Sequence, residues 1–116
     1  RESGGTVVSS ALELMREIIK DRYVDEQWNI YGAQASDGDN WDNDSPGCRQ
    51  LLSEAGGILS WCQYYAYIEI ADSPQGLWKN YEQVAAAYKG KFEMRRVKEP
   101  ADVYPVLHEL FKKEVV

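Results

Sequence analysis

Histidine, cysteine and long apolar runs are scarce in this chain of 116 residues. The single histidine, His108, excludes a multi-histidine metal site and argues against histidine-based catalysis. The two cysteines, Cys48 and Cys62, have neither the spacing of zinc ligands nor the number of a disulfide framework. We therefore predict two free thiols in a reducing, cytoplasmic compartment. No apolar run is long enough to span a membrane, and the first residues lack the apolar core of a signal peptide.

Positive charge is also in short supply, with 13 Lys and Arg against 19 Asp and Glu and a net charge of −6. Surfaces that bind nucleic acid or anionic lipid are basic, so we expect neither kind of partner. The hydrophobic fraction of 44% is that of an ordinary globular protein. The length suits one domain, or a piece of one, with a modest core.

Apolar periodicity predicts helices that alternate with strands along the whole chain. Helices are expected from Val8 to about Arg22, from Ser45 through Leu59, from Ser73 through Tyr88, and from a start between Ala101 and Pro105 to Lys113. The strands are expected at Trp28–Ala35, Cys62–Ile70 and Phe92–Val97. Ser45 and Ser73, each followed by proline, are predicted as helix N-caps, and Gly56-Gly57 weakens the second helix near its end.

This order predicts an α/β fold: a three-layer, partial doubly wound (Rossmann-like) parallel sheet with helices on both faces. Tyr64, Tyr65 and Tyr67 are expected in the core rather than on a binding platform, because their strand is covered on both faces. The charges of Phe92–Val97 are typical of an edge strand. The chain begins on a helix with no strand leading into it, so we expect the first part of the domain to be missing.

Two oxygen-bearing side chains are predicted at the edge of the sheet where parallel strands end, which is where ligands bind in such folds. Thr6 precedes the first helix, and Asp37 follows the first strand. A hydroxyl and a carboxylate are hard donors of the kind that Mg²⁺ or Mn²⁺ prefers. The residues alone leave a second interpretation open, in which Thr6 only caps its helix and Asp37-Gly38 only forms a turn.

The loop after Asp37 is acidic, with further carboxylates at Asp39, Asp42 and Asp44. It does not fit a calcium-binding EF-hand, which needs glycine where Asp42 stands and glutamate where Cys48 stands. A solvated acidic loop before a helix N-terminus is favoured instead. Trp41 in this loop is either a partner anchor or a cover over the edge of the sheet.

Several motifs of the chain resemble those of a known protein family. Gly4-Gly5-Thr6 before a helix and Ser36-Asp37-Gly38 after a strand resemble two loops of the metal-ion-dependent adhesion site of von Willebrand factor A (VWA) domains. Nearly the whole chain resembles the YeaH/YhbH-like family of VWA-related bacterial proteins. The segments that carry this resemblance are Arg1–Thr6, Ser9–Leu12, Trp28–Tyr31, Gln34–Asn40, Tyr64–Tyr67 and Asp102–Pro105.

The resemblance implies that residues 1–116 are the C-terminal portion of one VWA-like domain, without its first strands and its Asp-x-Ser-x-Ser loop. Thr6 would then ligate the metal directly or through water, and Asp37 through water. Asp39 and Asn40 would support these ligands without binding the ion themselves, and Trp41 would contact the partner. Mg²⁺ or Mn²⁺ is expected in the intact domain, whereas two loops alone should bind none.

The function implied is that of a protein-interaction module rather than an enzyme. Its metal ion would bind a carboxylate of another protein. The family resemblance also implies a role beside a serine protein kinase in bacterial sporulation or stationary-phase stress. Two alternatives stay open. One is Mg²⁺-dependent phosphoryl transfer with Asp37 as nucleophile and Asp39 two residues on, although no phosphate-binding Ser/Thr and Lys are evident nearby. The other is a scaffold or oligomerisation domain with a vestigial metal site.

One edge of the sheet carries a further expectation. VWA-like sheets have the strand order 3-2-1-4-5-6, so the strand 28–35 would pair with the missing first strand. That edge is mostly apolar and contains no charge or proline. We therefore expect the chain to self-associate through residues 28–35, as a two-fold dimer with a continuous sheet.

Overall fold

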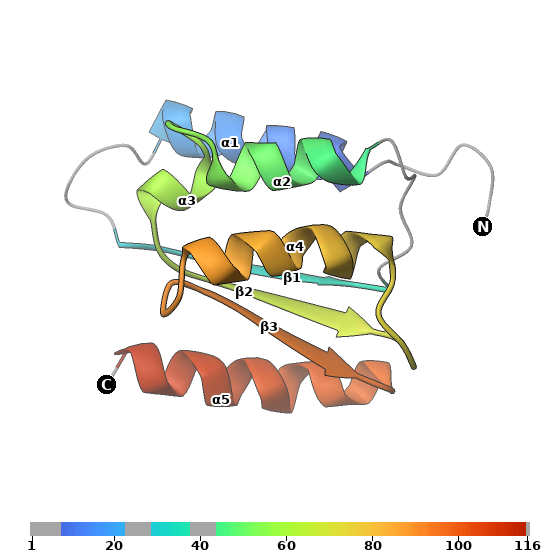
Figure 1. Ribbon diagram of the computed structural model, residues 1–116. Coiled ribbons are helices and arrows are strands. Elements are labelled where there is room, and N and C mark those ends of the chain that lie inside the picture. Colours follow the sequence, from blue (N-terminus) through green and yellow to red (C-terminus); the bar gives the residue numbers. More distant parts are fainter. Residues whose placement is uncertain (1–7, 23–28, 38–43, 116) are drawn as a thin grey trace.

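The computed structural model describes residues 8–22, 29–37 and 44–115. Helices and strands alternate along this part of the chain (Figure 1). The elements are α1 (Val8–Arg22), β1 (Ile30–Ser36), α2 (Ser45–Ser53), α3 (Ile58–Trp61), β2 (Cys62–Ile70), α4 (Gly76–Ala87), β3 (Phe92–Val97), the 3₁₀ helix η1 (Pro100–Asp102) and α5 (Val103–Val115). None of these helices is long and apolar enough to cross a membrane.

The three strands form a parallel sheet in the order β1-β2-β3. Helices α1, α2 and α4 lie over one face, and α5 lies over the other (Figure 1). The predicted α/β fold, with a parallel sheet between helices, is therefore confirmed. Within the described part, β3 pairs only with β2, so the strand with several charges is at an edge, as predicted.

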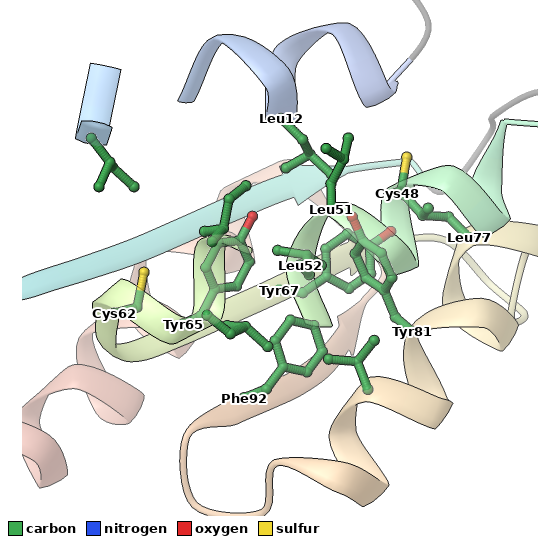
Figure 2. Packing of buried hydrophobic residues seen from close by; sticks show 14 residues of the cluster. Leu12, Cys48, Leu51, Leu52, Cys62, Tyr65, Tyr67, Leu77, Tyr81 and Phe92 are labelled. Carbon is green, nitrogen blue, oxygen red and sulfur yellow. The ribbon is translucent and has the colours of Figure 1, made fainter. Parts of the chain in front are cut away.

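The larger core lies between the sheet and α1, α2 and α4 (Figure 2). Its centre is aromatic: the ring of Tyr81 packs edge-on against Tyr67 and Phe92, with centroids 4.8 and 5.6 Å apart. Tyr65 stacks on Phe92 at 5.5 Å. These tyrosines are fully buried, which confirms that they belong to the core. Because a buried hydroxyl needs a hydrogen-bond partner, each of them requires a polar group at the boundary of the core.

The opposite face of β2 carries the alternate side chains of the strand, as the two-residue period of a strand requires. Tyr64, Ala66 and Ile68 are buried there against Leu110 of α5. The ring of Phe111 meets Tyr64 edge-on, with centroids 5.5 Å apart. Burial on both faces explains why β2 is almost continuously apolar.

The predicted helix caps are wrong. Asp44, not Ser45, is the N-cap of α2, and Ser45 is a buried first residue of that helix. Gln75, not Ser73, is the N-cap of α4, which begins at Gly76. Neither Asp44 nor Gln75 caps its own helix through a side-chain hydrogen bond. A serine before proline thus lies at or just before the start of each helix but is not its N-cap.

Two boundaries also differ from the sequence prediction. The helix expected from Ser45 through Leu59 is divided: the chain leaves the helical conformation at Glu54, with a ψ of 162°, and Gly56 follows with a φ of 77°. The following helix α3 begins only at Ile58. The first strand begins at Ile30 and extends to Ser36 rather than ending at Ala35; Trp28 lies outside the described residues.

Both cysteines are free, as predicted, and both are buried. Burial raises the pKa of the Cys62 thiol from 9.0 to about 11, against a smaller opposing effect of the Lys91 charge. Cys62 is therefore a neutral thiol at physiological pH, and it acts as a small apolar side chain of the core.

Candidate functional site

The candidate site lies at the edge where β1 and β2 end. Ser36 is the last residue of β1, and its register partner on β2 is Glu69. Asp37 follows Ser36 directly, and its side chain is exposed. Because parallel strands end at the same edge, the topology brings a hydroxyl and two carboxylates, one exposed and one buried, to the same edge of the sheet.

Glu69 is the only carboxylate among the fully buried residues of the described part. Its Oε1 accepts a hydrogen bond from the Tyr67 hydroxyl at 2.7 Å, and its Oε2 accepts one from the backbone N–H of Gln75 at 3.0 Å. Gln75 is the N-cap of α4, where the helix dipole favours negative charge. Glu69 thus accepts the backbone N–H of the N-cap residue of α4.

Tyr67 connects this carboxylate to β1. Its hydroxyl lies 3.0 Å from the Ser36 Oγ. Burial raises the pKa of Tyr67 well above its ordinary range; the Ser36 hydrogen bond opposes this, and the charges of Glu69 and Asp37 add to it. The Tyr67 hydroxyl therefore stays protonated and donates. Ser36, Tyr67, Glu69 and Gln75 form one hydrogen-bonded chain, here named the edge chain.

A second polar contact lies deeper on the same face of β1. The Oε1 of Gln34 accepts hydrogen bonds from the hydroxyls of Tyr65 at 2.8 Å and Tyr81 at 3.2 Å. Burial raises the pKa of both tyrosines far above their ordinary range. Gln34 and Ser36 are two residues apart, so the tyrosine layer of the core is satisfied by alternate residues of β1.

Of the residues predicted for the metal site, the structure describes Asp37. Thr6, Asp39, Asn40 and Trp41 lie outside the described residues. The expected approach of the Thr6 and Asp37 oxygens therefore stays a prediction.

The described residues offer the kind of ligand atom that a divalent cation prefers, but too few of them to complete its coordination shell. Ser36 and Asp37 offer oxygen donors, which suit Mg²⁺ or Mn²⁺. Within residues 8–22, 29–37 and 44–115, no group of three or more His, Cys, Asp and Glu side chains could hold an ion. A complete coordination shell would need oxygen atoms from outside this part of the chain.

Asp44 has a structural role that the sequence did not indicate. Its carboxylate accepts hydrogen bonds from the backbone N–H and the hydroxyl of Ser9, at 3.0 and 2.6 Å. Ser9 lies in the first turn of α1, so Asp44 caps α1 from the start of α2. The interpretation of Asp44 as part of a solvated acidic loop is therefore wrong.

Sequence reasoning missed Glu69, Tyr67 and Ser36 as members of one polar group. One signal could have identified Glu69: it is an acidic residue near the end of a strand that is otherwise apolar on both faces. A buried carboxylate in such a strand needs donors. Its donors are Tyr67 of the same strand and the backbone of Gln75, and only the Ser36 contact depends on the register between β1 and β2, which the sequence does not specify.

The outer edge of β1 lies beside an apolar groove. A cavity of about 510 Å³ is lined by residues of α1 and β1, including Leu14, Met15, Ile18 and Tyr31. Leu14, Ile18 and Tyr31 are among the few exposed large apolar side chains of the described part. Strand β1 itself carries no charged residue. This surface therefore combines an edge without a paired neighbour in the described part with exposed apolar side chains.

Comparison with known proteins places residues 1–114 in a family model described as "Protein of unknown function (DUF444)". The chain is similar to a "UPF0229 protein" of Thiobacillus denitrificans, with 61% identity over 98% of this chain and 27% of that protein. It is 54% identical to a "UPF0229 protein" of Chromohalobacter salexigens, over 99% of this chain and 27% of the relative. It is 52% identical to "UPF0229 protein YE2273" of Yersinia enterocolitica, again over 27% of the relative.

The chain thus spans about a quarter of the length of these relatives. No solved structure matches it.

Proposed function

This chain belongs to the DUF444 family, and on that premise we propose that it forms part of a VWA-like protein-interaction module. In the intact domain, a Mg²⁺ or Mn²⁺ ion at the edge of the sheet bridges to an Asp or Glu carboxylate of a partner protein. The proposal extends to a cytoplasmic role beside a serine protein kinase in bacterial stress or sporulation.

The observation that carries this proposal is the position of Asp37. Its exposed carboxylate follows β1 at the edge where a parallel sheet binds ligands. The preceding residue, Ser36, is fixed by its hydrogen bond to Tyr67. A loop that begins from a fixed point can present a carboxylate at a defined place, which ion binding requires.

Each residue of the site would have its own role in binding the ion or the partner. Asp37 and Thr6 would supply oxygen atoms to the ion, and Asp39 and Asn40 would hold these groups or their water molecules in place. The bound ion supplies a positive charge that attracts the partner's carboxylate. Trp41 would pack against the partner beside it.

Replacement of Asp37 by alanine tests the metal site, in a form of the protein with the length of its relatives. We expect Asp37→Ala to weaken Mn²⁺ binding at least about tenfold, since loss of even indirect ligands costs 10–100-fold. Calorimetric titration of Mn²⁺ measures the change. The matched control is Asp21→Ala, because Asp21 is an exposed carboxylate at the end of α1, on the side of the sheet where β1 begins (Figure 1).

Equal Mn²⁺ affinity in the wild-type protein and Asp37→Ala would contradict the proposal. Capture of a partner that chelator abolishes, and that Asp37→Ala also lacks, would extend it from the metal to the interaction. Mg²⁺-dependent release of inorganic phosphate that requires Asp37 would instead favour the phosphoryl-transfer alternative.

A second candidate function, self-association, is favoured by the groove beside β1. Two copies related by a two-fold axis perpendicular to the sheet would pair their β1 edges and bring their α1 helices together. Leu14 and Ile18 of each copy would then face the groove of the other. Each copy carries a net charge of −6, so such a dimer would tighten as salt screens the repulsion.

Sedimentation of the 116-residue chain tests this candidate. We expect a dimer whose dissociation constant rises at least about tenfold in Leu14→Asp, since a charge buried in an apolar contact costs more than the roughly 1.4 kcal/mol this requires. Tyr104→Asp is the control, because Tyr104 is 74% exposed on α5, on the opposite face of the sheet. A wild-type chain that stays monomeric at high concentration would show that this edge does not bind a second copy.

A further inference from the structure

The outer edge of β3, the side turned away from β2, faces no other strand of the described residues (Figure 1). The carbonyls of Lys91 and Val97 point the other way, because N–H groups of β2 and of the residue after it donate to them at 2.8 and 2.9 Å. The backbone groups of a strand are directed alternately to its two sides. The N–H and C=O groups of Met94 and Arg96 therefore face outward, toward the position that a further strand would take.

The side chain of Arg95 covers one of these outward groups. Its Nη1 donates to the Met94 carbonyl at 2.7 Å and lies 3.3 Å from the Oε1 of Glu93. The second distance is long for a hydrogen bond between charged groups, which is typically about 2.7–2.9 Å. A neutral strand that added here would compete with the guanidinium for the carbonyl, whereas an acidic strand would offer the guanidinium a carboxylate instead. The edge therefore suits an acidic strand better than a neutral one.

Arg96 adds a positive charge beside the same edge. Its guanidinium lies over the ring of Trp78, 5.4 Å from the centroid, and forms no ion pair with the residues that the structure describes. The ring is itself held by a hydrogen bond from its N–H to Glu82 at 3.1 Å. Trp78 thus keeps the Arg96 charge at the edge, and a carboxylate is the partner that this charge lacks.

A groove of about 350 Å³ lies between this edge and α5. The described residues that line it are two cations, one carboxylate and apolar side chains: Arg95, Arg96, Glu109, Pro105, Val106 and Leu110. The groove is therefore positively charged in a chain whose net charge is −6. A peptide that adds to an open strand edge pairs its backbone with the strand and places alternate side chains in flanking pockets. Here these pockets offer cations and an apolar wall.

We infer that the outer edge of β3 is a docking site for an extended acidic segment of a partner protein, which adds to the sheet as a further strand. A carboxylate of the segment draws the Arg95 guanidinium away from the Met94 carbonyl, and that carbonyl then accepts a backbone N–H of the segment. Arg96 binds a second carboxylate. No metal ion takes part, so this surface is independent of the proposed metal site.

Fluorescence anisotropy of labelled peptides tests this inference in a form of the protein with the length of its relatives. The probes are peptides of about eight residues in which valine alternates with glutamate, glutamine or lysine. We expect the glutamate peptide to bind about tenfold more tightly than the glutamine peptide, since each of two exposed ion pairs contributes a few-fold. The lysine peptide should not bind. High salt should remove most of the difference between the glutamate and glutamine peptides.

Two substitutions separate the roles of the arginines. Arg96→Gln should weaken binding of the glutamate peptide about threefold and leave the glutamine peptide unchanged. Arg95→Ala removes a charge but also frees the Met94 carbonyl, so it should weaken the glutamate peptide and tighten the glutamine peptide. A purely electrostatic role of Arg95 would not tighten the neutral peptide. Lys20→Ala is the control, because Lys20 is an exposed cation on α1, away from β3.

Amide hydrogen exchange identifies the surface that the peptide covers. With saturating glutamate peptide, the N–H groups of Met94 and Arg96 should exchange at least about tenfold more slowly, because they become hydrogen-bonded. Slow exchange of both groups without peptide would show that another part of the protein already covers this edge, and would overturn the inference. It is also overturned if the lysine peptide binds as tightly as the glutamate peptide, or if Arg95→Ala does not tighten the glutamine peptide.

Discussion

Replacement of Glu69 by alanine is expected to lower the free energy of unfolding by about 3 kcal/mol, from the loss of two hydrogen bonds to a buried charged group. The substitution leaves the Gln75 N–H without its acceptor at the start of α4 and leaves the Tyr67 hydroxyl without its own. Both groups lie where water has poor access, because Glu69 is fully buried. Urea unfolding, followed by far-ultraviolet circular dichroism at one protein concentration, measures the change.

Glu109→Ala is the matched control for this substitution. Glu109 is exposed on α5, so its removal should alter the free energy of unfolding by no more than about 0.5 kcal/mol. If Glu69→Ala were as stable as the control, the Glu69 carboxylate would not be what holds the start of α4. The structural basis of the edge chain would then be lost as well.

Gly32→Ala should also destabilise the protein by about 3 kcal/mol, at the upper end of what overpacking costs. A Cβ atom on Gly32 would lie 2.5 and 2.8 Å from two carbon atoms of the Tyr65 ring. That ring cannot move aside easily, because it is stacked on Phe92 and its hydroxyl is bonded to Gln34. Gly32 and Tyr65 are register partners, so the smallest residue of β1 makes room for one of the largest of β2.

The control for this prediction is Gly47→Ala, which should have the opposite sign. Gly47 lies within α2, and a Cβ atom there would meet nothing within 4 Å. Alanine should raise the free energy of unfolding by about 0.5–1 kcal/mol through its helix propensity. Thermal unfolding of the two variants in parallel measures both changes. If Gly32→Ala left the free energy of unfolding unchanged, the Tyr65 ring would have space that its contacts do not indicate.

The parts of the fold that the sequence predicted are those that repeat a simple pattern. Helix α1 and strand β2 have the bounds expected, since an amphipathic stripe and a doubly buried strand are each visible over many residues. The division between α2 and α3 depends on the backbone torsion angles of Glu54 and Gly56, for which the sequence offered only two adjacent glycines. Chain geometry at a single residue is not encoded in a periodic pattern.

In the candidate site, the features that follow from the order of strands and helices were predictable, and those that depend on strand pairing were not. The position of Asp37 at the end of β1 follows from the alternation of strands and helices alone. The edge chain does not, because Ser36 and Tyr67 are brought together only by the pairing of β1 with β2. Asp44 was misinterpreted for the same reason: its partner, Ser9, is 35 residues away.

The parallel arrangement of the strands bears on how this protein reaches its structure. Every pairing joins distant residues, such as Ala33 with Ala66 and Tyr67 with Met94, so no sheet contact can form locally. Closing such loops costs chain entropy before any contact repays it, which makes folding slow compared with that of a helical bundle. On the ribosome, β1 can pair with β2 only after the whole of β2 has emerged. During that interval the uncharged edge of β1 that later pairs with β2 is open, and a chaperone that shields short apolar strands would have a target there.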